Sequence, residues 1–243
     1  MKLLAFCTRN AKEILRDPLA VAFSAGFPIA LLLLLTAIQS NVPVALFEIE
    51  RLAPGIAIFG LSFLTLFCAT LLARDRESSL LQRLYATPLT AVDFIAGYAL
   101  PILPIAAAQS GACYLTAVLL GLPLSQRVLY AVAIDVPISV LYLALGLLCG
   151  SVFTVKQVGG ICGALLTNLS AWLSGTWFDL ELAGGAFERI AYALPFIHAV
   201  ELERAVLSGN LQGMFTHFIW VAAYTVVIAV LAIYAFLRQM RKR

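Results

Sequence analysis

Few of the polar side chains in this sequence stand at the spacings that known catalytic sites use. The two histidines, His198 and His217, lie outside any H-E-x-x-H arrangement, so a zinc protease site is not expected. Glu201, Glu203 and Arg204 are close in sequence, but no G-x-S-x-G elbow or other nucleophile accompanies them. The sequence therefore predicts no catalytic residues.

Nucleotide and metal binding have no support either. A phosphate-binding loop, G-x-x-x-x-G-K-[ST], is absent, because Gly159, Gly160 and Gly163 have no Lys-Ser or Lys-Thr after them. The 5 cysteines are scattered, with no C-x-x-C pair and no clustering with histidine. We expect them to be small apolar packing residues. The chain is therefore predicted to bind no metal and to cradle no nucleotide by this device.

Asp135 is the one charged residue inside the long apolar stretches of the chain. Two interpretations are open. It could couple transport to an ion, because carriers driven by protons or sodium bury ionisable residues along their path. Alternatively, it lies within about two turns of the outer end of its stretch, from where its carboxylate can reach water. We favour the second interpretation.

The elements that must position these residues are membrane-spanning helices. The chain of 243 residues is 62% hydrophobic and only 12% charged, against about 25% charged residues in soluble domains. Apolar runs of about twenty residues match the bilayer core, and they are apolar on every face, which excludes a membrane barrel. The predicted spans are Leu19–Ile38, Leu52–Ala73, Phe94–Leu120, Val128–Val152, Val158–Trp177 and Phe218–Leu237.

Basic residues predict the orientation of these spans. The N-terminus, the second and fourth loops and the C-terminus together hold 12 Lys and Arg residues, and the loops on the other side hold 4. Because cytoplasmic loops carry an excess of basic residues, both termini are expected in the cytoplasm.

Two segments on the cytoplasmic side have amphipathic patterns. The first, Lys2–Asp17, has apolar residues at helical spacing and ends at Asp17-Pro18, which predicts a helix lying in the membrane interface. The second, Arg74–Thr90, begins with Arg74, Asp75, Arg76 and Glu77 and continues into a leucine-rich helix that Pro88 ends. The apolar face of that helix consists of Leu80, Leu81, Leu84 and Tyr85, with Arg83 beside it. Such a face either rests on the membrane or docks a partner.

The long connection Phe178–Phe215 precedes the last span on the outer side. It contains a Gly184-Gly185 break, Pro195 and an amphipathic helix predicted over Phe196–Leu207. Neither piece is long enough to span. The connection is either a surface cap or a pair of short helices at membrane depth, which are tolerated where protein buries them or where they line a cavity.

Together these segments resemble a known family. The Arg16-Asp17-Pro18 elbow, the Arg76-Glu77 pair before a leucine-rich helix and Thr87-Pro88, and Pro195-Phe196-x-His198 before a final span look like the permease subunits of type-2 ATP-binding-cassette exporters. The resemblance covers essentially the whole chain, residues 1–243, as one domain, and is nearest to small drug- and antibiotic-resistance permeases. One departure is Ser78-Ser79, where many relatives have Gly-Thr.

The resemblance implies an all-α membrane protein with six spans that works as half of a dimer, homodimeric or paired with a paralogue. Two copies of a separate ATPase subunit would bind ATP and Mg²⁺, because such permeases bind neither. The elbow and the cytoplasmic helix would contact the ATPase through Arg16, Asp17, Arg74, Arg76, Glu77, Leu80, Leu81, Arg83, Leu84 and Tyr85.

The second and fifth spans would line the substrate path. Phe59, Phe63 and Phe67 recur every fourth residue on one, and Asn168 and Trp172 stand four apart on the other. Such a stripe is commonly core packing, but an aromatic wall also suits an amphipathic cargo. The candidate outer-cap residues are Pro195, Phe196, His198, Glu201 and Arg204.

The expected protein is thus an exporter permease in the plasma membrane of a prokaryote, moving a drug, antibiotic, peptide, lipid or glycan outward, with no nucleic acid partner. The alternative is an ion-coupled secondary transporter.

Overall fold

The computed structural model describes residues 2–18, 22–43, 47–78 and 90–241, and all regular structure in these residues is helical. Two of the elements are π-helices, marked η, which are wound more widely than α-helices. In chain order the elements are α1 (Lys2–Leu15), η1 (Ala22–Gly26), α3 (Phe27–Gln39), α4 (Ile49–Glu77), α6 (Ala91–Ala99), α7 (Leu103–Leu119), α8 (Gln126–Val152), α9 (Val155–Val158), η2 (Gly159–Leu166), α10 (Thr167–Leu173), α11 (Leu180–Ala183), α12 (Gly185–Tyr192), α13 (Pro195–Ser208) and α14 (Leu211–Arg241).

The protein is an all-α integral membrane protein, as predicted. Helical stretches long and apolar enough to cross a bilayer run over Ala22–Gln39, Ile49–Glu77, Asp93–Leu119, Gln126–Val152 and Leu211–Gln239. The predicted fifth span, Val158–Trp177, is also helical through Leu173, but it is divided among α9, η2 and α10. Pro101 and Pro104 likewise divide the predicted third span into α6 and α7.

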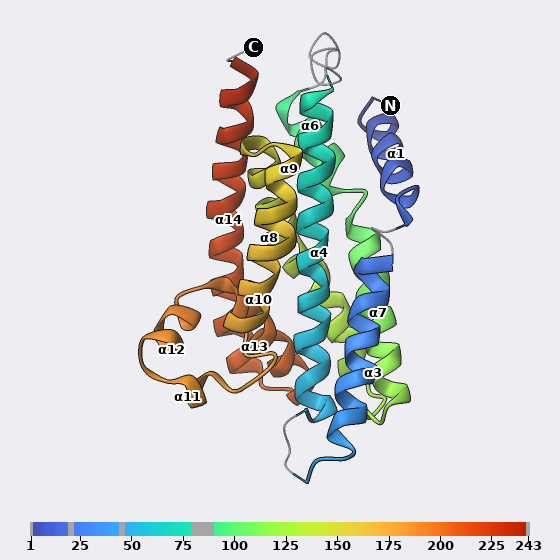
Figure 1. The fold of residues 1–243 in the computed structure, drawn as a ribbon, viewed down its shortest axis with the longest axis vertical. Coiled ribbons are helices and arrows are strands. Elements are labelled where there is room, and N and C mark those ends of the chain that lie inside the picture. The colour runs from blue at the N-terminus through green and yellow to red at the C-terminus, as the bar shows by residue number, and fades with distance from the viewer. Residues whose placement is uncertain (1, 19–21, 44–46, 79–89, 242–243) are drawn as a thin grey trace.

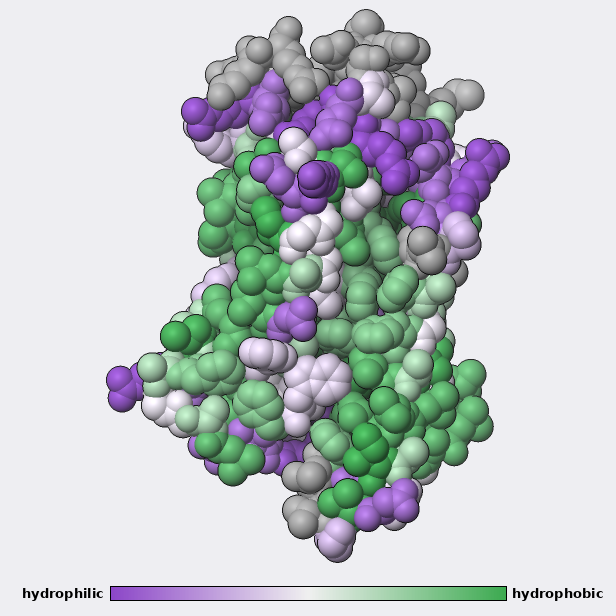
Figure 2. Space-filling model, viewed as in Figure 1, coloured by the Kyte–Doolittle hydropathy of each residue, from purple (hydrophilic) through white to green (hydrophobic). Residues whose placement is uncertain are grey.

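The helix α1 and the last turns of α14 lie at the same end of the bundle, here called the terminal end (Figure 1). The opposite end, where α13 lies, is called the far end. Figure 2 shows hydrophilic residues gathered at the terminal end and a broad hydrophobic surface below them. That distribution fits a bundle whose middle faces lipid and whose terminal end faces water.

The long helix α4 forms the centre of the bundle. In its apolar window 83% of the residues are buried, against 11% for α14, so α4 is enclosed by protein and α14 is peripheral. Two glycines allow α8 to approach it closely. A Cβ atom at Gly146 would lie 2.8 Å from the Thr65 carbonyl oxygen, and one at Gly150 would lie 2.7 Å from that of Ala69. Small residues four apart are a common device for close helix contact in membranes.

One predicted boundary was wrong. Arg74–Glu77 was assigned to a loop helix, but these residues form the last turn of α4, because the helix continues unbroken to Glu77. The helix that contains the predicted last span, α14, begins at Leu211, so its first residues belong to the predicted connection Phe178–Phe215. The predicted amphipathic helix over Phe196–Leu207 is present as α13, and most of its residues are buried in the bundle. A surface cap is therefore not the correct description of α13.

Candidate functional site

At the terminal end, a buried ion pair joins α1 to the last turns of α4. The side chain of Asp75 is 3% exposed and that of Arg9 is 36% exposed. The Arg9 guanidinium donates to both carboxylate oxygens, with Nη2 2.8 Å from Oδ1. The hydroxyl of Tyr98 on α6 donates to Oδ2 at 2.9 Å. A bidentate arginine–carboxylate pair fixes both partners in direction as well as distance, so three helices meet at one carboxylate.

The contacts around this ion pair hold α1 against α6. The amide of Asn10 is buried and donates to the Gly97 carbonyl oxygen at 2.8 Å. The Phe6 ring packs edge-on against Phe94 and Tyr98, with ring centroids 5.7 and 5.2 Å apart. We call Arg9, Asn10, Asp75, Gly97 and Tyr98 the Asp75 clamp. The elbow helix is therefore fastened to the bundle by polar bonds, in addition to its apolar packing.

Arg76 and Glu77, which follow Asp75 in the sequence, bond α4 to the α8–α9 connection. The Arg76 guanidinium donates to the carbonyl oxygens of Ser151 and Phe153. A Glu77 carboxylate oxygen accepts from the backbone N–H of Val155 at 2.9 Å. Arg76 and Glu77 lie immediately before residues 79–89. The last turn of α4, from which the chain continues into residues 79–89, is therefore bonded to α1 and α6 on one side and to the α8–α9 connection on the other.

Of the residues predicted to contact an ATPase, the described ones lie at the terminal end. Arg16 and Arg74 are exposed, and Asp17 is half-buried. Leu80, Leu81, Arg83, Leu84 and Tyr85 lie outside the described residues. The prediction missed Arg9, Asp75 and Tyr98, because it placed Asp75 in a loop and considered only local spacing, whereas Arg9 is 66 residues away from Asp75.

A cavity of about 370 Å³ lies near the clamp, between α1, η1, α4 and η2. Phe23, Phe63 and Phe67 contribute aromatic walls, and charged groups lie at its rim. The rim residues are Glu13, Asp17 and Arg74. An apolar cavity of this size with a few charged groups at one side can hold a small amphipathic molecule.

The predicted aromatic stripe divides between the core and this cavity. Phe59 and Phe63 are buried and pack on each other at 5.5 Å, and Phe59 also contacts the ring of Trp177 at 5.6 Å. Phe67 is half-buried. Asn168 and Trp172 do not join them: both are exposed on α10, and the Asn168 amide donates to the Ala164 carbonyl oxygen at 2.7 Å.

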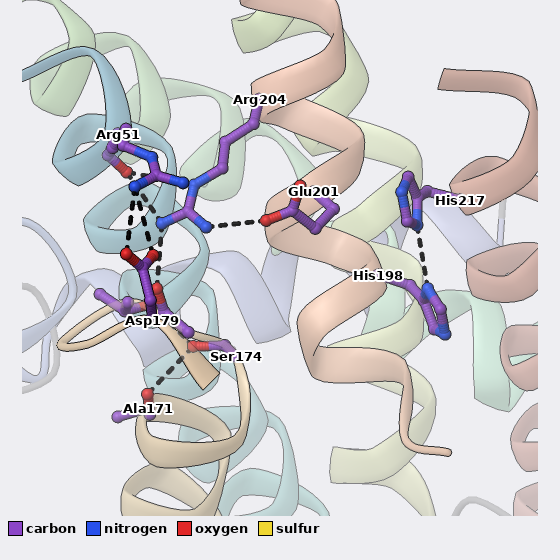
Figure 3. A network of polar contacts seen from close by, with 10 residues as sticks. Arg51, Ala171, Ser174, Asp179, His198, Glu201, Arg204 and His217 are labelled. Atoms are coloured by element: carbon purple, nitrogen blue, oxygen red, sulfur yellow. Dashed lines mark hydrogen bonds and ion pairs between the residues drawn. The ribbon is translucent and has the colours of Figure 1, made fainter. Parts of the chain in front are cut away.

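At the far end, Arg204 joins α13 to two other segments (Figure 3). Its guanidinium donates to Glu201 at 2.8 Å, to the Gly175 carbonyl oxygen at 3.0 Å and to that of Arg51 at 3.2 Å. The Arg51 side chain in turn pairs with Asp179 at 3.2 Å, where both groups are exposed. Exposed pairs contribute little to stability, so the carbonyl contacts of Arg204 are the part of this network that fixes geometry.

The other cap residues lie inside the bundle. Pro195 starts α13, and Phe196 packs on Tyr142 of α8 with ring centroids 6.3 Å apart. His198 is 5% exposed, stacks on Trp220 at 4.8 Å, and has its Nδ1 2.9 Å from Nδ1 of His217. Its Nε2 lies 3.0 Å from the Tyr192 carbonyl oxygen. Burial lowers the pKa of His198, which favours a neutral ring that donates from Nε2 and accepts at Nδ1.

A comparison with protein families places the chain. Residues 1–208 match the model of the ABC-2 type transporter, which covers the elbow, the spans through η2 and α10, and α13. The chain therefore belongs to the ABC-2 type transporter family, and it is a membrane permease of that family. No curated protein matches the chain.

Proposed function

We propose that this chain is the membrane-spanning subunit of an ATP-driven exporter, and that a separate ATPase subunit docks at its terminal end. The proposal has both termini in the cytoplasm of a prokaryote, two permease copies, either identical or paralogous, and two ATPase copies. Each ATPase copy would carry the ATP and Mg²⁺. Drug or antibiotic resistance would be one use of such an exporter.

The Asp75 clamp is the observation that carries this proposal. It joins the elbow helix, the central helix and α6 at the point where the chain enters residues 79–89, whose sequence contains the leucine stripe. A force applied to that segment would enter α4 directly, because α4 runs on to Glu77, and the contacts of Arg76 and Glu77 would pass part of it to α8 and α9. The sequence has no phosphate-binding loop, so a partner would have to supply ATP hydrolysis.

The cavity near the clamp favours an amphipathic molecule as the proposed substrate. Its aromatic walls would take an apolar body, and Glu13, Asp17 and Arg74 would face a polar or charged head. Two residues of the predicted path, Phe63 and Phe67, line the cavity.

Co-purification tests the assembly. A tagged permease is expressed with a candidate ATPase that contains a phosphate-binding loop, and ATP hydrolysis is measured in the eluate. Changing Leu80 and Leu84 to Glu should release the ATPase while the permease stays membrane-inserted. Leu182→Glu is the matched control, because Leu182 is 81% exposed on α11, away from the terminal end. Full retention of the ATPase by the double variant would show that this segment is not its main docking site.

A further inference from the structure

Two carboxyl groups face each other inside the far half of the bundle. Asp135 of α8 and Glu203 of α13 are both 0% exposed, and each acts directly on the other. The helix α7 adds two hydroxyl groups to this site. The Ser110 hydroxyl donates to Oδ2 of Asp135, and the Tyr114 hydroxyl lies toward Glu203. We call these four residues the carboxyl site.

Several oxygens of the carboxyl site are buried without a hydrogen-bond partner. They are Oδ1 of Asp135, both carboxyl oxygens of Glu203 and the hydroxyl oxygen of Tyr114. An unpartnered buried polar atom costs free energy, and two facing carboxylates cannot satisfy each other, because an ionised carboxylate only accepts hydrogen bonds. The site as it stands therefore requires something that supplies a donor or a positive charge.

No basic side chain in the described part of the chain supplies that charge. The groups that act most strongly on Glu203 are Asp135, Tyr114 and Cys113, and none of them is a cation. The helix α7 has no basic residue. Other basic residues of the neighbouring helices have other partners or lie elsewhere. Arg51 pairs with Asp179, Arg127 donates to the carbonyl oxygens of Leu207 and Ser208, and Arg204 donates to Glu201 and to two carbonyl oxygens. His198 lies against His217, Arg189 is exposed on α12, and Arg74, Arg76 and Arg238 lie in the last turns of α4 and α14.

One proton resolves both problems. It removes one of the two like charges, and it turns one carboxyl group into a donor that the other can accept. Burial, together with the neighbouring Asp135, raises the pKa of Glu203 well above its usual range. The two groups are close enough for each to influence the ionisation of the other, so a single proton can be shared between them. The Ser110 hydroxyl already donates to Oδ2 of Asp135, and the Tyr114 hydroxyl is a second donor on the Glu203 side of the pair.

We propose that Asp135 and Glu203 form a proton-binding site, that they hold one proton between them, and that the protonated pair fastens α13 to α7 and α8. Loss of this proton places two negative charges between α8 and α13 and weakens that attachment. The helix α13 is therefore held to the bundle by a bond that responds to proton activity, separately from the contacts of Arg204.

The sign of the pH effect follows from Glu203. Its pKa is higher in the folded protein than in an unfolded chain, where it is about 4.3. The stabilisation that protonation gives is thus complete at low pH and is lost as the pH rises through the folded-state pKa. The melting temperature of the full-length permease in detergent should fall as the pH is raised above neutrality.

The test combines melting curves with infrared spectra of the same samples, prepared without sodium. Wild type should show the carbonyl band of a protonated carboxyl group at neutral pH. Glu203→Gln should lose that band, and its melting temperature should no longer fall with rising pH. Glu201→Gln is the matched control on the same helix and should keep both features.

If Glu203→Gln does not fold, Asp135→Asn serves instead, and its Glu203 band should titrate at lower pH than in wild type because the neighbouring charge is gone. The proposal would be overturned if wild type lacked the band at neutral pH. It would also be overturned if adding sodium at fixed pH raised the melting temperature and the band were absent, because the site would then bind sodium and not a proton.

Discussion

Replacing Arg9 with alanine would test whether the Asp75 clamp holds the elbow helix to the bundle. The variant leaves the carboxylate of Asp75 buried with the Tyr98 hydroxyl as its remaining side-chain donor. Removing one partner of a fully buried ion pair costs about 3–5 kcal/mol, and exposed pairs are worth about 0–1 kcal/mol. Arg9 is 36% exposed and Asp75 is 3% exposed, so the pair lies between these limits. We expect Arg9→Ala to lower the free energy of unfolding by about 2 kcal/mol.

The expected shift is large enough to measure. For globular proteins of this length, 1 kcal/mol corresponds to about 2–4 °C in melting temperature, which gives a drop of roughly 4–8 °C for Arg9→Ala. Arg9→Lys should lie between wild type and Arg9→Ala, because an ammonium group keeps the charge but loses the bidentate geometry. Melting of the detergent-solubilised permease, followed by intrinsic fluorescence, provides the values.

A double-mutant cycle separates the ion pair from the packing of the Arg9 stem. Arg9→Ala, Asp75→Ala and the double variant should show a coupling energy of at least about 1 kcal/mol. The double variant should therefore be more stable than the sum of the two single changes predicts. A coupling energy within about 0.3–0.5 kcal/mol of zero would refute the reasoning, since independent sites are additive within that range.

Three other predictions rest on separate features of the bundle. Gly150→Ala should destabilise the permease by about 1–3 kcal/mol, because the added Cβ would lie 2.7 Å from a backbone oxygen of α4. Gly111→Ala is the matched control in melting curves, because a Cβ there would meet no atom within 4 Å, and equal effects of the two changes would contradict the prediction. Asp135→Asn should retain most ATP-dependent uptake into inverted vesicles, whereas an ionophore-sensitive uptake lost in this variant would favour an ion-coupled carrier. In a background without reactive cysteines, a cysteine at the exposed position Glu48 should be labelled by an impermeant thiol reagent on intact cells, and one at Lys156 only after permeabilisation; the reverse pattern would invert the proposed orientation.

Much of the helical architecture could be predicted from the sequence, because a bilayer accepts only helices where the chain is apolar on every face. The elbow helix and α13 were also predictable from the spacing of their apolar residues. Helix ends were less so. The charged run at Arg74–Glu77 looks like the start of a loop, yet α4 continues through it because these side chains find partners on three other segments.

The sites were harder to predict than the fold. The Asp75 clamp and the carboxyl site each join residues on helices far apart in the sequence, and no local spacing marks such pairs. Asp135 stood out because it is the one charge inside a span, but its partner Glu203 looked like an ordinary polar residue of an outer helix. The spacing of Gly146 and Gly150 can be read from the sequence and indicates a close helix contact. The sequence does not show that the helix in contact is α4.

The unbroken length of α4 has a mechanical consequence. At about 1.5 Å per residue its 29 residues make a rod of roughly 43 Å, and the glycines of α8 press against it near Thr65 and Ala69. We hypothesise that this contact is a pivot. The arm from Ala69 to Glu77 is then about 12 Å long and the arm from Thr65 to Arg51 about 21 Å. A tilt that moves Glu77 by about 1 Å would move Arg51 by nearly 2 Å in the opposite direction, and would so change the contact between the Arg51 carbonyl oxygen and the guanidinium of Arg204. Distances between spin labels on α4 and α8 should then change with opposite sign at the two ends, and changes of the same sign would exclude a pivot. On this geometry, a small displacement of α4 at one face of the membrane is enlarged at the other face, because Gly146 and Gly150 place the pivot closer to Glu77 than to Arg51.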